Sequence, residues 1–120
     1  MDIILWIVAA VLAAAFLASG VLKLVWSRER LVAAGMAWAG QFSSRFVKGI
    51  GVLEILAAVG LVVPAALGIA SVLAPLAATG LVLLMAGAVV THLRRGEMQP
   101  VAVNLVFLGL SAFVAWGLLV

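Results

Sequence analysis

The sequence predicts an all-α membrane protein, a four-helix transmembrane bundle that forms one domain over residues 1–120. Composition is the first reason: 68% of the 120 residues are hydrophobic and 9% are charged, whereas a soluble domain is roughly half apolar and a quarter charged. So short a chain cannot bury that much apolar surface inside itself. Lipid is therefore the expected solvent, and helices are the expected form, because an open sheet would leave backbone groups unpaired in lipid.

Four apolar runs provide the second reason. Each is close to the length of about 20 helical residues that crosses a hydrocarbon core, and they cover residues 3–26, 46–63, 67–90 and 100–120. The short sequence "PAA" at 64–66 predicts a tight turn between the second and third runs. Pro75 lies inside the third run and predicts a kink there, because proline lacks a backbone donor.

The distribution of charge is the third reason, and it predicts an orientation. All seven lysines and arginines lie in the segments 23–48 and 94–95. Cytoplasmic loops of membrane proteins carry an excess of such residues. We therefore expect a multi-pass protein of the cell membrane, with the connections 27–45 and 91–99 in the cytoplasm and both termini outside.

The connection 27–45 is long and mixed in character. Apolar side chains such as Leu31, Met36, Trp38 and Phe42 are scattered among small and polar residues. The pattern is compatible with a short interfacial helix or a re-entrant loop. A plain surface loop is equally compatible with it.

Glu54 is the acid of the second run. It lies eight residues beyond Phe46, which is roughly 12 Å along a helix. Carboxylates at such depth are costly, so they usually face a bundle interior or a cavity. The small residues Gly51, Ala57 and Ala58 on its helical face would let a second helix approach closely.

Lys23 is the candidate partner of Glu54. It lies near the end of the first run, with Ser19 and Gly20 on its own face. The two runs should be antiparallel neighbours, which would bring both charges into one half of the membrane. The alternative is that Lys23 extends its head to the interface while Glu54 is protonated, because burial disfavours the charged form.

The remaining two runs each add a polar group at a similar depth. His92 ends the third run and Asn104 begins the fourth. With Lys23 and Glu54 they predict a buried polar cluster, or a ligand site, built from one residue of each helix. His92 could instead belong to a solvated helix end, and Asn104 could be a hydrogen-bonded anchor between helices.

Several classes of function are disfavoured by the composition. The chain has no cysteine, which excludes disulfides and thiol chemistry, and one histidine with four acids is too few for an ordinary metal site. No nucleophile–base pair or phosphate loop appears, so we predict no catalytic residue. The basic residues flank apolar runs, which favours a lipid bilayer over nucleic acid as the partner.

Four stretches resemble a known family. They are "SGVLKL", "GMAWAGQFSSRFVKGIG", "GVLEILAAVGLVVP" and "LMAGAVVTHLRRGE". In order and spacing they are similar to the DoxX-like family of small membrane proteins, over roughly residues 16–97. The resemblance implies a four-helix transmembrane bundle, and it matches Lys23, Glu54 and His92 to polar residues of the family. It carries over no catalytic residue.

The resemblance implies several functions. Relatives are associated with quinone-linked sulfur oxidation, with defence against oxidative stress alongside soluble enzymes, and with receptor assembly. We therefore expect a module that binds a small apolar molecule, a quinone or a lipid, or that anchors a partner protein or a second copy of itself. An assembly factor and a small transporter are the alternatives, and an enzyme ranks last. No covalent or metal cofactor is expected.

Overall fold

A computed structural model describes residues 2–69 and 72–119, in which all secondary structure is helical. The elements in chain order are α1 (Ile3–Val25), α2 (Arg28–Ala33), the 3-10 helix η1 (Ala37–Gln41), α3 (Ser44–Leu67), α4 (Leu73–Arg94) and α5 (Met98–Leu119). Four of these, α1, α3, α4 and α5, are long and apolar enough to cross a membrane. The predicted class, an all-α four-helix membrane bundle, is confirmed.

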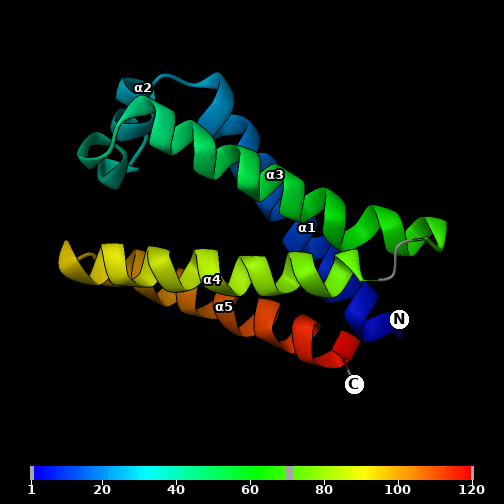
Figure 1. Ribbon diagram of the computed structural model, residues 1–120. Helices are drawn as coiled ribbons and strands as arrows, with labels where there is room; N and C mark the ends of the chain where they lie inside the picture. The colour runs from blue at the N-terminus through cyan, green and yellow to red at the C-terminus, as the bar shows by residue number, and fades with distance from the viewer. Residues whose placement is uncertain (1, 70–71, 120) are drawn as a thin grey trace.

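The four long helices are arranged as two pairs (Figure 1). α1 packs along α3 and α4 packs along α5, while α3 also contacts α4. Both termini lie at one end of the bundle, and α2 and η1 lie at the other. We call this second end the basic end. There α1 ends, α3 begins and α4 turns into α5.

The core contains side chains from all four long helices. Its buried members are Ala9, Leu12, Phe16, Ala58, Leu61, Ala78, Leu81, Met85 and Val114. Large apolar side chains also cover the outside of the bundle: Leu83 is 70% exposed and Trp116 is 66% exposed. A helix that is apolar on every side needs lipid around it, so the exposed pattern agrees with a membrane location.

Two glycines set the distance between α1 and α3. A Cβ atom at Gly20 would lie 2.6 Å from the carbonyl oxygen of Gly51, and one at Gly51 would lie 2.9 Å from the Cβ of Lys23. Any side chain at either position would push the helices apart. This backbone contact is the small-residue packing common in membranes, and it places Lys23 directly beside α3.

The ends of α3 and α4 differ from the prediction. The turn predicted at 64–66 is wrong, because α3 continues through Pro64 and ends at Leu67. A proline there removes one backbone donor and crowds the carbonyl of Gly60, which membrane helices tolerate where neighbours compensate. The chain instead turns at Gly68, whose φ of 69° suits glycine. The predicted third span also includes residues 70–71, and the fourth includes residue 120, all outside the described residues.

Pro75 has a different setting from the one predicted. α4 begins at Leu73, so Pro75 lies in the first helical turn, where no intrahelical donor is needed. The carbonyl of Pro75 accepts a hydrogen bond of 2.8 Å from the Thr79 hydroxyl. A proline in this position requires no kink.

The connection 27–45 is not a plain surface loop. It holds α2 and η1, and its Leu31 and Ala39 form a second hydrophobic cluster with Val47 of α3. Leu31 and Ala39 are fully buried. Ser27 and Ser43 accept hydrogen bonds from Arg30 and Phe46 backbone N–H groups and so begin α2 and α3. The segment is therefore a packed cover over the basic end.

We predict that this cover faces the cytoplasm, because it and the α4–α5 turn carry the basic residues. Single cysteines at Ser27 and Gln99 should be protected from impermeant thiol reagents in intact cells, and one at Ile69, beyond the end of α3, should react. The chain has no cysteine of its own, so labelling reports the introduced site alone. The reverse labelling pattern would contradict the orientation.

Candidate functional site

A buried ion pair joins α1 and α3 near the basic end. The Lys23 Nζ lies 2.6 Å from the Glu54 Oε1, and the two residues are 6% and 2% exposed. The Lys23 ammonium also donates to the Ser19 hydroxyl at 2.6 Å. The structure thus brings together the two charges that the sequence suggested as partners, through the glycine contact of Gly20 and Gly51.

Trp38 of η1 lies over this pair and links it to α4. The Lys23 Nζ is 5.7 Å from the centre of the Trp38 ring, within range of a cation–π interaction. Trp38 also makes an edge-to-face contact with His92, with ring centres 6.5 Å apart. An aromatic side chain of the cover therefore touches polar residues of both helix pairs.

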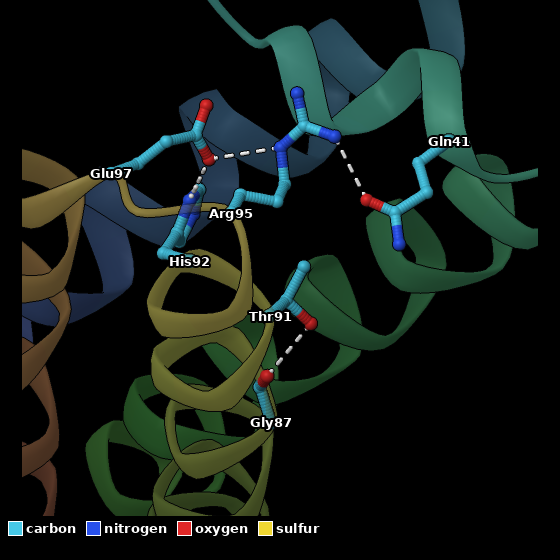
Figure 2. Close-up of polar contacts among 6 residues, drawn as sticks. All are labelled: Gln41, Gly87, Thr91, His92, Arg95 and Glu97. Carbon is cyan, nitrogen blue, oxygen red and sulfur yellow. Dashed lines mark hydrogen bonds and ion pairs between the residues drawn. The ribbon is translucent and has the colours of Figure 1, made fainter.

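His92 is fixed by the way α4 ends. Gly96 adopts a φ of 71°, and the backbone N–H of Glu97 donates to the His92 carbonyl at 2.9 Å, the pattern of a Schellman turn. This turn folds Glu97 back, so that its Oε1 lies 2.8 Å from the His92 Nδ1 (Figure 2). His92 itself is 8% exposed.

The hydrogen bond to Glu97 also assigns the proton on the His92 ring. The bond from His92, with the Arg95 guanidinium beside it, holds the pKa of the Glu97 carboxyl below its usual value of 4.5. An ionised carboxylate only accepts hydrogen bonds, so the Nδ1 of His92 carries the proton. The Nε2 is then left to interact with another group, and second hydrogen bonds of this kind commonly set the tautomer of a functional histidine.

Arg95 connects this turn to the cover. Its Nε donates to Glu97 at 3.1 Å, and its terminal nitrogen donates to the Gln41 side-chain oxygen at 2.8 Å (Figure 2). Gln41 ends η1. A chain of polar contacts from His92 through Glu97 and Arg95 thus holds η1 against the α4–α5 turn.

A cavity of about 460 Å³ lies beneath the cover. Its polar lining includes Lys23, Glu54, His92 and Asn104, and its apolar lining includes Phe16, Met36, Trp38, Phe42, Met85 and Phe107. Small-molecule sites in proteins have this size and this combination of a mostly apolar wall with a few convergent polar groups.

The four sequence-predicted residues therefore meet around one cavity, although they do not all touch one another. Lys23 contacts Glu54, whereas His92 pairs with Glu97. Asn104 is half-buried on α5 and also lines the cavity. Its amide offers one donor group and one acceptor to the cavity.

The sequence did not predict which side chains of the cover line the cavity; we call these side chains the roof. Met36, Trp38 and Phe42 line the cavity from the connection between α1 and α3. Their spacing follows no helical period, because η1 and its flanking residues are irregular. The partner of His92 was missed as well, since only the turn at Gly96 brings Glu97 back to it.

The described residues contain no group of three His, Cys, Asp or Glu side chains that could hold a metal ion. The polar groups around the cavity are instead suited to hydrogen bonding. Lys23 and Asn104 offer donors, Glu54 offers acceptors, and Trp38 and Phe42 offer ring faces.

Fold and site together define a small integral membrane protein whose four-helix bundle has a partly polar cavity beneath the cover. The family model described as the DoxX-like family matches residues 7–114, so the chain belongs to the DoxX-like family. No curated protein and no solved structure matches the chain.

We predict that the Lys23–Glu54 pair behaves as a coupled unit. Removing one partner leaves an unpaired buried charge, which costs about 3–5 kcal/mol. Lys23→Met and Glu54→Leu should therefore each lower the free energy of unfolding, measured by titration with a denaturing detergent, by more than the double variant does. Additive losses in this double-mutant cycle would reject the coupling.

Glu54→Gln provides the conservative control for this cycle. The amide oxygen can still accept a hydrogen bond from the Lys23 ammonium, which leucine cannot do. We expect the glutamine variant to be more stable than the leucine variant.

Proposed function

We propose that this protein binds an amphiphilic small molecule, a quinone or a lipid, with its uncharged polar head in the cavity beneath the cover. The observation that carries the proposal is the cavity itself, about 460 Å³ in volume, with polar side chains from α1, α3, α4 and α5 around it. Bundle cores are a usual place for ligand sites. A purely structural polar cluster would not need space beside it.

The charges around the cavity favour an uncharged head. The Lys23 ammonium and the Glu54 carboxylate neutralise each other at 2.6 Å, and Glu97 is paired with both His92 and Arg95. A charged ligand would bring an unpaired charge into a site of low dielectric constant, which is costly. A carbonyl or hydroxyl head group needs only the donors that Lys23 and Asn104 provide.

The aromatic roof favours a head with a flat face. Trp38 and Phe42 contact each other edge to face, with ring centres 6.2 Å apart, and both line the cavity. Flat rings stack on aromatic side chains with favourable offset geometry. A quinone head combines a flat ring with carbonyl acceptors, so it satisfies both features of the site, and a lipid ester satisfies the second.

In this proposal the protein serves membrane redox or stress physiology by holding the ligand, or by presenting it to a partner protein at the basic end. Assembly of other membrane proteins and transport are the competing functions. The charge-balanced cavity favours binding over assembly, because an assembly factor needs exposed helix faces and no cavity.

Native mass spectrometry of protein purified in mild detergent tests the proposal. Wild type should carry a small amphiphile, and Asn104→Leu should lose most of it while keeping a melting temperature close to that of wild type, because it removes a donor for the head group and leaves the Lys23–Glu54 pair intact. Gln99→Leu is the matched control, because Gln99 is an exposed amide on α5, the helix of Asn104, and does not line this cavity.

Two outcomes would count against binding. A wild-type protein with no bound small molecule would leave partner assembly as the better account. An Asn104→Leu variant that loses ligand only in proportion to a lowered melting temperature would show that the cluster is structural.

A further inference from the structure

A second hollow continues from the cavity along the outside of the bundle. It is a groove of about 570 Å³ between α3 and α4, and every residue that lines it is apolar or glycine. Leu53, Leu83 and Leu84 line both the groove and the cavity. The polar cavity and the apolar groove therefore meet at these three side chains.

The junction lies on the lipid-facing surface. Leu53 is 55% exposed and Leu83 is 70% exposed, so lipid reaches the boundary between the two hollows. Phe46, at the cavity's edge, is 50% exposed. A molecule dissolved in the bilayer could enter here from the side without leaving the membrane.

The groove is long enough for an extended chain. Along α4 it runs from Leu84 to Leu73, which is roughly 16 Å at the helical rise, or about half of a hydrocarbon core. Gly60 forms part of its floor, where a Cβ atom would lie 3.4 Å from the Cβ of Ala77. α3 and α4 are thus close at this point, so the groove is shallow where it passes over the contact between them.

From this continuity we propose that the groove holds the apolar tail of the molecule whose head occupies the cavity. The ligand class is then a long-tailed amphiphile that enters sideways between α3 and α4. The inference rests on the proposed function. The groove has no polar residue that could hold a head group of its own, so its occupant must be held by its head at the cavity.

Gly80 offers a way to fill the groove alone. It lines the groove but not the cavity, and a Cβ atom there would meet nothing within 4 Å. The leucine side chain of Gly80→Leu should therefore fill part of the groove without disturbing the core. Gly109→Leu is the matched control, because Gly109 is also an exposed helical glycine with nothing within 4 Å, and it lines neither hollow.

Two probes distinguish the contribution of the head from that of the tail to binding. One is a benzoquinone with an isoprenoid chain, and the other is the same benzoquinone without the chain. Binding is measured as quenching of Trp38 fluorescence in a full-length protein whose Trp6, Trp26 and Trp116 are replaced by phenylalanine. The ratio of variant Kd to unmodified Kd is compared for each probe, because that ratio cancels the probe's own partitioning into detergent.

Gly80→Leu should weaken binding of the tailed probe by about fivefold through lost packing contacts, and should leave the Kd of the tailless probe unchanged. Gly109→Leu should change neither. An unchanged Kd for the tailed probe in Gly80→Leu would overturn the groove proposal. If Asn104→Leu still weakened both probes in that case, the proposed function would stand without the groove.

Two further results would also overturn the groove proposal. Failure of both probes to bind the unmodified protein would remove the proposed function and this inference with it. A change in subunit number in Gly80→Leu, seen by native mass spectrometry, would show that a second copy of the chain covers the groove.

Discussion

Gly20 of α1 and Gly51 of α3 face each other without side chains, so that the two helix backbones are in contact. Cβ atoms at these positions would lie 2.6 Å and 2.9 Å from the opposing carbonyl oxygens. Such contact is the usual means of helix association in lipid, where no hydrophobic force drives helices together. Because Lys23 and Glu54 each lie three residues beyond a member of this glycine pair, the contact also decides that their side chains meet.

The remainder of the site is arranged around that pair. Trp38 from η1 rests over the Lys23 ammonium and against His92, and Arg95 holds Gln41 at the end of the same helix. The cover is thus tied both to the α1–α3 pair and to the α4–α5 turn. α3 and α4 are close at Gly60 and Ala77, and the cavity occupies the space between the two helix pairs nearer the basic end.

The sequence was sufficient to predict four apolar helices and the deep position of Glu54, because composition, length and the cost of a buried carboxylate act locally. It also suggested Lys23 as a partner, since small residues flank both charges. It did not locate the turn after α3, because a proline in the last turn of a helix and a proline that ends a helix give the same sequence pattern. The aromatic side chains over the cavity could not be predicted, because the position of Trp38 depends on its packing against Leu31 and Ala39 within the cover rather than on a periodic pattern.

The role of the glycine contact is tested most directly by two variants of α3, Gly51→Ala and Gly49→Ala. For each, the melting temperature and the amount of bound small molecule are measured in mild detergent. Both changes give α3 the same gain in helix propensity, about 1 kcal/mol, but a Cβ at Gly49 meets nothing within 4 Å. We predict that Gly51→Ala lowers both quantities and that Gly49→Ala lowers neither. Equal behaviour of the two variants would contradict the claim that the α1–α3 contact organises the buried pair and the cavity.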